Sequence, residues 1–404
     1  MSTLPRLEFW TDRAVPAKES ARALSAPGIL FAVLGFAAIL VPFVTLSANR
    51  IVAGEGITVW RLAGPGITLP GLVSIAAGLI LGLLAAWPRI RLAGAVLGLA
   101  GLLWLVMNAA PSLLAGAGEF ARVSPAVGFW CLLVVLVLLM SDALGNLAPG
   151  PLARASLLIA VLATLALILW SGALSDLSIL REYAGRKSAF VDATLRHLGL
   201  AFGSLLIAGI IGFPLGILCH RRARLRGLIL PVLSFLQTIP SLAMFGLMIP
   251  ILSWVGDTVP GAQAIGIAGI GFAPAFLALV FYSLLPVVGN TVAGLASAPP
   301  AAIEAARGMG MTQRQRLMRV ELPLGLPVIL SGVRIVLVQN IGLAVIAGLI
   351  GGGGFGTFVF QGLNQTATDL ILLGALPTVV LALVAAMVMD ILVDLARPIP
   401  ETTA

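Results

Sequence analysis

The sequence predicts an all-α polytopic membrane protein of about ten transmembrane helices, and three observations support this prediction. The 404 residues are 60% hydrophobic and only 10% charged, whereas a soluble domain carries roughly 25% charged residues. The mean hydropathy is +1.11. Long stretches without a charged residue recur along the chain. A water-soluble globular fold is excluded because so few polar side chains could not cover its surface, so aqueous contact must be confined to loops.

The charge-free stretches define the individual spans. A helix needs about 20 apolar residues to cross the hydrocarbon core of a bilayer. Lipid-facing backbone must hydrogen-bond within its own segment, so these stretches predict helices, and no short alternating strands of a barrel are visible. We expect spans at residues 28–47, 67–87, 92–110, 123–141, 155–175, 197–219, 229–251, 272–295, 325–347 and 370–392.

The spans fall into two groups of five. Residues 1–27 mix four cations with three anions and predict a cytoplasmic N-terminal segment, followed by a first span that favours a membrane anchor over a cleaved signal peptide. Residues 28–176 form an N-terminal membrane extension with almost no polar residue within the bilayer. The charged stretch 176–196 ends it, and residues 177–404 hold five spans interrupted by proline, glycine and amides.

The distribution of cations predicts the orientation. The side of the membrane that holds both termini carries 16 Lys and Arg residues and the other side carries 7, while Arg334 lies within a span. Because cytoplasmic loops are enriched in Lys and Arg, both termini are expected in the cytoplasm. The net charge of +8 is therefore interpreted as membrane topology and not as a nucleic-acid surface.

The composition also excludes several kinds of binding and catalytic site. Neither Lys18 nor Lys187 lies in a G-x-x-x-x-G-K-[ST] frame, so any ATP must be bound by another chain. Cys131 and Cys219 lie in apolar stretches and predict no disulfide framework. With two dispersed His residues, no metal site, cofactor site or catalytic set is visible, so the chain is not expected to be an enzyme. An ion-coupled secondary transporter would need related halves and intramembrane carboxylates, which are nearly lacking.

The loop between the eighth and ninth spans, residues 298–323, carries the most specific signal. Two prolines can begin a helix, the following AAIEAAR favours helix, and Gly308 and Gly310 then break it. A second, basic helix is expected from Thr312, a good N-cap, and to stop before the next span at the proline of the Leu-Pro pair. Considered alone, the segment could also be an ordinary positive-inside loop with a surface helix.

The spacing within this loop resembles the EAA signature of ABC importer permeases. The EAA triplet is followed by three residues, a glycine, nine residues, Val320 in place of the usual Ile, one residue and Leu-Pro. We call residues 298–323 the EAA loop. The positions that match or adjoin the signature are Glu304, Ala305, Ala306, Gly308, Gly310, Leu322 and Pro323.

The resemblance extends over about half of the chain. Residues 197–398 are similar to the permease core of methionine and osmoprotectant importers. The stretches IEAARGMGM, VELPLGLPVIL and VQNIGLAVIAGLIGGGGFG look most like permeases for quaternary amines. Residues 1–175 lie outside the usual core, although some osmoprotectant permeases have such an N-terminal membrane extension.

The resemblance implies a type I ABC importer fold, a location in the bacterial inner membrane, and a transport function. The cargo would be glycine betaine, choline or carnitine; the alternatives are another small solute such as an amino acid, or an ion-coupled transporter. The implied partners are a second permease copy or paralogue, an extracytoplasmic binding protein, and cytoplasmic ATPases. Each ATPase would receive Glu304, Ala305, Ala306, Gly308 and Gly310 in a surface groove. Leu322 and Pro323 would set the angle into the next span.

Five polar or kink-forming residues within the spans are candidates for the substrate pathway: Gln237, Pro240, Tyr282, Gln339 and Asn340. Proline frees a backbone carbonyl, and nearby polar groups could line a water-filled path. The alternatives remain open: Ser and Thr can satisfy the freed backbone, amides can join helices, and the tyrosine can be a core residue.

Four further features have less specific interpretations. Arg334 would be costly in the membrane, so it acts as a gate, as an ion-pair partner, or as an anchor that extends to the interface. Asp390 is interpreted as interfacial. The Gly351 to Gly354 turn is expected at the outer side, touching the binding protein. His197 and His220 are assigned no ligand role.

Overall fold

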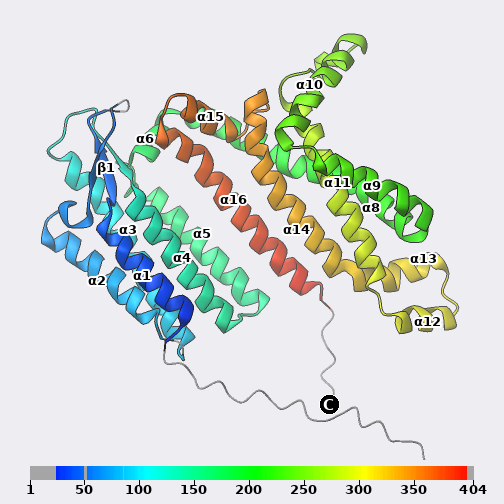
Figure 1. Ribbon diagram of the computed structural model, residues 1–404, viewed down its shortest axis with the longest axis horizontal. Helices are drawn as coiled ribbons and strands as arrows, with labels where there is room; N and C mark the ends of the chain where they lie inside the picture. The colour runs from blue at the N-terminus through cyan, green and yellow to red at the C-terminus, as the bar shows by residue number, and fades with distance from the viewer. Residues whose placement is uncertain (1–23, 50–51, 85, 398–404) are drawn as a thin grey trace, which may run out of the picture. The chain divides into compact units, whose positions relative to one another are not determined.

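The computed structural model describes residues 24–49, 52–84 and 86–397, which pack as two compact units, residues 1–149 and 150–404 (Figure 1). Most of the predicted cytoplasmic segment, residues 1–23, lies outside the described residues. The predicted module boundary near residue 176 stays a prediction; by packing, the helix that follows residue 150 belongs with the C-terminal unit.

The N-terminal unit combines four helices with a small sheet. The helices are α1 (Ala26–Leu40), α2 (Pro65–Leu81), α3 (Pro88–Leu114) and α4 (Val127–Leu147), with a 3-10 turn at Val59–Arg61. The antiparallel strands are β1 (Val44–Ser47), β2 (Glu55–Ile57) and β3 (Arg122–Pro125), in the order β2-β1-β3.

The sheet corrects two sequence predictions. No strands were expected, because segments of three and four residues are too short for a detectable alternation. The apolar end of the predicted span 28–47 is strand β1, and α1 ends before it, at Leu40. Helix α1 therefore has only 15 residues, and α2 has 17. Among the described residues, eight helices are long and apolar enough to cross a membrane.

A buried cation ties the helices of this unit together. The Arg91 side chain of α3 is only 3% exposed and pairs with Asp142 of α4. Its Nε also donates to the carbonyl of Gly82, at 3.1 Å. A buried charge is costly unless it is paired and hydrogen-bonded, and Arg91 has both compensations.

The described residues of the C-terminal unit form helices joined by turns and short loops. Its first half contains α5 (Pro151–Trp170), α6 (Ser178–Gly185), α7 (Lys187–Leu198), a π turn (Gly199–Gly203), α8 (Ser204–Arg221), α9 (Ala223–Thr238) and α10 (Ser241–Thr258). After a 3-10 turn at Gln263–Ile265, it continues with α11 (Phe272–Ala296), α12 (Pro300–Gly308), α13 (Gln313–Arg316), a π turn called η4 (Leu317–Glu321), α14 (Leu322–Ile346), a 3-10 turn (Ala347–Ile350), α15 (Gly356–Asn364) and α16 (Thr368–Leu395).

Helix α11 lies at the centre of this unit, between α8 and α14, and glycines allow the close approach. A Cβ at Gly216 of α8 would lie 2.5 Å from Cβ of Thr291 on α11. At the other face, Gly294 of α11 meets Gly325 of α14 backbone to backbone. Small residues at helix interfaces are typical of membrane proteins, because close van der Waals packing replaces the hydrophobic effect there.

Two predicted elements differ in the C-terminal unit. The predicted span 229–251 is wrong as one continuous helix, since α9 ends at Thr238 and α10 begins at Ser241. The residue before a proline disfavours helical backbone, and Ile239 is extended before Pro240. The prediction that a helix stops at Leu322-Pro323 is also wrong, because the helix runs on from Gln313 to Ile350. Pro323 follows the π turn and lies in the first turn of α14, where its missing N–H is tolerated.

Candidate functional site

The EAA loop folds as two short helices around a glycine turn. Helix α12 has Pro300 in its first turn and ends at Gly308, and Gly310 has φ of 75°, a conformation that favours glycine. Thr312 caps α13 in a capping box: Gln315 N–H donates to Thr312 Oγ1 at 3.3 Å, and Thr312 N–H donates to Gln315 Oε1 at 2.8 Å. The predicted glycine break and N-cap are confirmed. In Figure 1, α12 and α13 extend beyond the lower ends of α11 and α14.

The EAA residues separate into an exposed face and a packed face. Glu304, Ala305 and both glycines of the loop are exposed, and Pro323 is exposed further along the chain. Ala306 is fully buried. Leu317 of the π turn η4, which packs against α12, is buried as well. Two methionines stand on the free surface, Met309 at 70% exposure and Met318 at 56%. The loop thus presents small, flexible apolar and charged groups outward, among them Glu304 and the exposed Arg307, Arg314 and Arg319, while it rests on the start of α14.

Three of the five pathway candidates meet at the break between α9 and α10. Gln237 Nε2 donates to the backbone carbonyl of Tyr282 at 2.7 Å, and the Tyr282 hydroxyl donates to the carbonyl of Ile239. Pro240 follows directly as the residue before α10. Tyr282 is only 6% exposed. The two polar side chains therefore join α11 to the interrupted helix and satisfy a carbonyl that the break leaves free.

The remaining two candidates lie on α14. Asn340 is fully buried, and its Nδ2 donates to Ser204 Oγ of α8 at 2.9 Å and to Ser283 Oγ of α11 at 2.8 Å. The neighbouring Gln339 is half-buried. The structure gives Asn340 the helix-joining contacts of the alternative interpretation. The sequence did not single out Ser204 and Ser283, because a serine that faces a neighbouring helix looks the same in sequence as one that bonds its own backbone.

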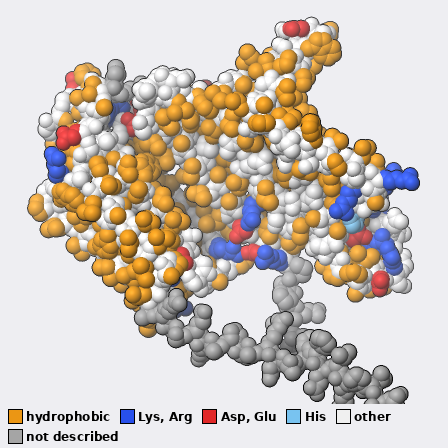
Figure 2. Space-filling model, in the orientation of Figure 1, with side chains coloured by type: hydrophobic (Ala, Val, Ile, Leu, Met, Phe, Trp, Pro, Cys, Tyr) orange, Lys and Arg blue, Asp and Glu red, His pale blue; other side chains and the backbone are white. Residues whose placement is uncertain are grey.

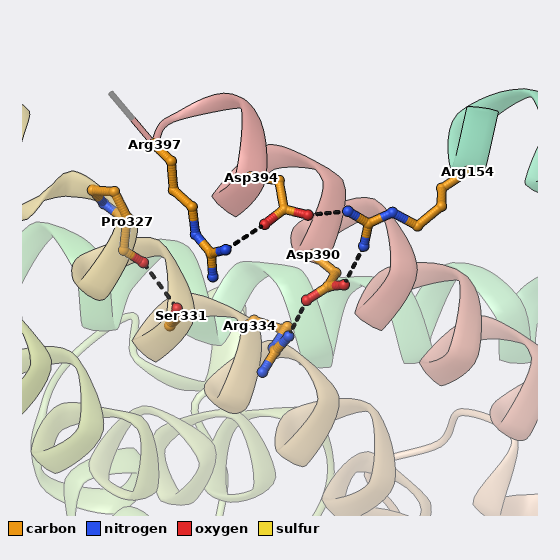
Figure 3. Close-up of polar contacts among 7 residues, drawn as sticks. All are labelled: Arg154, Pro327, Ser331, Arg334, Asp390, Asp394 and Arg397. Atoms are coloured by element: carbon orange, nitrogen blue, oxygen red, sulfur yellow. Dashed lines mark hydrogen bonds and ion pairs between the residues drawn. The ribbon is translucent and has the colours of Figure 1, made fainter. Parts of the chain in front are cut away.

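Arg334 takes part in a chain of ion pairs (Figure 3). Its guanidinium pairs with Asp390 of α16, which also accepts from Arg154 of α5 at 2.9 Å. Asp394, one turn further along α16, pairs with both Arg154 and Arg397. Figure 3 shows the two carboxylates between the guanidinium groups. The ion-pair interpretation of Arg334 is therefore the one that the structure supports, and Asp390 is more than an interfacial residue.

Helix α5 is joined to α16 by this chain of ion pairs. No residue of α5 is buried. The helix packs on α16, where Arg154 anchors its first turn through Asp390 and Asp394. Charged side chains are sparse on the face seen in Figure 2, where hydrophobic side chains predominate. A chain of carboxylates and guanidiniums among such surroundings is thus a specific attachment of α5 to α14 and α16.

The Gly351 to Gly354 turn is tightly packed. Gly351, Gly353 and Gly354 all have positive φ. A Cβ at Gly354 would lie 3.1 Å from Nδ1 of His197. His197 is fully buried, and its ring centroid lies 4.7 Å from that of Phe355, with the two ring planes tilted by 37°. These contacts fix the turn against the helix that contains His197.

A polytopic helical unit with a two-helix loop of EAA spacing defines a transporter permease. Residues 212–398 match the family described as binding-protein-dependent transport system inner membrane component, and residues 25–180 match the N-terminal domain of the ABC transporter permease YehY. The chain belongs to the permease subunits of ABC importers, as predicted. Membership of this family also confirms that the chain is a transport subunit and not itself an enzyme.

Two bacterial permeases agree with this assignment. The chain is 44% identical over 191 residues to the osmoprotectant import permease protein OsmW of Salmonella typhimurium, covering 47% of this chain and 84% of the relative. It is 39% identical over 207 residues to the glycine betaine/carnitine/choline transport system permease protein OpuCD of Bacillus subtilis, covering 51% of this chain and 83% of that relative. An inward-facing structure of the MetNI methionine ABC transporter is similar with 22% identity and a TM-score of 0.47, covering 52% of this chain and 98% of that one.

Proposed function

We propose that the chain is the membrane-spanning subunit of an ATP-driven importer of quaternary-amine osmoprotectants such as glycine betaine, choline or carnitine. The observation that carries the proposal is the identity of 44% to an osmoprotectant import permease along 84% of that protein. Relatives with carnitine, choline and glycine betaine in their names are 34–39% identical.

The proposed mechanism begins at α12. A cytoplasmic ATPase receives the exposed face of the EAA loop, where Glu304 and Ala305 face outward. Ala306 and Leu317 transmit the displacement of α12 to the π turn, and the continuous helix from Gln313 to Ile350 carries it into the core. A second permease, identical or paralogous, completes the pathway, and a binding protein delivers cargo on the opposite side.

The proposed topology has ten spans with both termini in the bacterial cytoplasm. It adds α1 and α2 to the eight longer helices and treats α9 and α10 as one interrupted crossing. The excess of Lys and Arg on the EAA-loop side supports this orientation. Helices α1, α2, α3, α4 and α5 would then form the five-span N-terminal extension.

The substrate part of the proposal is tested by uptake of radiolabelled glycine betaine. Cells that lack other betaine importers would express this chain together with its ATPase and binding-protein partners. We expect saturable uptake that unlabelled choline or carnitine competes for and that is lost when the ATPase is omitted. No uptake of betaine, choline or carnitine would reject the osmoprotectant cargo, and uptake of radiolabelled methionine would instead favour an amino acid.

A further inference from the structure

A buried carboxylate lies in the bend between the EAA loop and α14. Glu321 is the last residue of the π turn, and only 6% of it is exposed. It lies in the single unspecified position of the signature between Val320 and Leu322, so the motif gives no reason to select it. A carboxylate this buried is costly unless charged or hydrogen-bonding groups compensate for it.

The two oxygens of Glu321 engage two different parts of the protein. Oε1 accepts from Arg316 Nε of α13 at 2.7 Å. Oε2 lies 3.6 Å from Nε2 of His220, in the last turn of α8. Arg316 and His220 are themselves only 18% and 25% exposed. One carboxylate thus links the EAA loop to the end of a core helix that is remote in sequence.

The location of this link matters because it joins the start of α14 to the last turn of α8, whereas the Asn340–Ser204 bond joins the two helices at the first residue of α8. Both pack on α11 through glycine contacts, at Gly216 for α8 and at Gly325 for α14. A displacement of α12 reaches α14 directly, through the π turn and the continuous helix. It reaches the end of α8 through Glu321 and His220.

A displacement of α12 could be lost in the π turn η4 (Leu317–Glu321), because this turn could change conformation instead of passing the movement on to α14. A π turn has i→i+5 hydrogen bonds and occurs mostly as a single widened turn, often at functional sites. Arg316 immediately precedes the turn and Glu321 ends it, so their ion pair spans all five of its residues. The pair restrains the turn from relaxing to ordinary helix, a change that would rotate α12 and α13 relative to α14.

We propose that Glu321 is a positioning residue for transport: with Arg316 and His220 it makes α12, α8 and α14 move as one when the ATPase acts. The proposal rests on the proposed function, since it assumes that α12 receives the ATPase. It predicts that loss of the carboxylate uncouples ATP hydrolysis from uptake while the ATPase still binds.

The test uses the complete transporter with Glu321→Gln, which keeps the shape and removes the charge. We expect normal membrane insertion and ATPase co-purification, but solute moved per ATP hydrolysed reduced on the order of tenfold, as expected for loss of a hydrogen-bonded charge. Glu119→Gln, an exposed residue of the N-terminal unit, is the charge-matched control and should transport normally. Unchanged uptake per ATP in Glu321→Gln would overturn the proposal, as would loss of ATPase binding.

A double-mutant cycle separates this role from simple packing. His220→Gln retains the Arg316–Glu321 pair, so it should fold even if Glu321→Gln does not, and it should also lower uptake per ATP. If the two residues act through one contact, the double variant is no worse than Glu321→Gln alone, whereas independent effects multiply. If the losses caused by Glu321→Gln and His220→Gln multiply in the double variant, the proposed link from Glu321 to α8 through His220 is overturned. Because each ratio is measured with whichever solute the unmodified transporter imports, a different cargo would contradict the proposed function without affecting this result.

Discussion

Replacing Gly325 by alanine tests the central packing of the permease core. Gly325 of α14 faces Gly294 of α11, and an added Cβ would fall on the Gly294 backbone carbonyl. The reciprocal Cβ at Gly294 would lie 2.7 Å from the carbonyl oxygen of Gly325. Because both obstacles are backbone atoms, no side-chain rotation can relieve the contact, and the two helices must separate.

The expected magnitude follows from two opposing effects. Overpacking of a close-packed interface costs about 1–3 kcal/mol, while alanine favours helix over glycine by up to about 1 kcal/mol. The net destabilisation for Gly325→Ala is therefore up to about 2 kcal/mol, with a central value of about 1 kcal/mol. Gly342 provides a matched control in the same helix, because it is exposed and a Cβ there meets nothing within 4 Å. Gly342→Ala should be neutral or stabilising by up to about 1 kcal/mol.

The assay is the temperature at which half of the detergent-purified chain loses its monodisperse gel-filtration peak. A change of 1 kcal/mol shifts the melting temperature by roughly 2–4 °C in proteins of 150–250 residues, so the two variants should differ by several degrees in opposite directions. If Gly325→Ala melts at or above the temperature of Gly342→Ala, the backbone-to-backbone contact between α11 and α14 is refuted.

Three further substitutions address the other sites. Glu304→Lys should abolish ATPase co-purification while the chain still inserts, because it replaces the acidic side chain on the exposed face of α12 by a basic one; retention of the ATPase equal to that of Glu119→Lys would contradict the docking role. Asp390→Asn should lower stability by about 1 kcal/mol, the upper range for partly exposed pairs, and high salt should reduce this difference; a salt-independent effect would refute an electrostatic attachment of α5. Asn340→Ala should cost about 0.6–1.7 kcal/mol, as for hydrogen bonds between membrane helices, with cargo affinity unchanged; lost affinity at full stability would instead place Asn340 in the pathway.

The sequence predicted the features that depend on composition and local chemistry. Charge-free stretches indicated the long helices, and proline, glycine and threonine predicted the ends of α12 and the start of α13. The spacing of the EAA loop was sufficient to indicate the family, because it fixes many residue types over 20 positions of one segment.

The features that were missed depend on contacts between distant segments. Apolar residues before Ser47 looked like membrane span, but they pair as a strand with residues near 124. Pro323 looked like a helix end, since the preceding π turn has no sequence signature. Partners such as Asp390 for Arg334 and Glu321 for His220 lie 56 and 101 positions apart, and one sequence contains no signal for such pairs.

The central claim is that this chain moves a quaternary amine only when a partner hydrolyses ATP. The most direct measurement is glycine betaine uptake by proteoliposomes that contain the chain with its ATPase and binding protein, with ATP supplied to the ATPase side. We predict accumulation that requires ATP, the ATPase and the binding protein, and that collapse of ion gradients does not abolish. Accumulation driven by an ion gradient in vesicles that lack the ATPase would contradict the account.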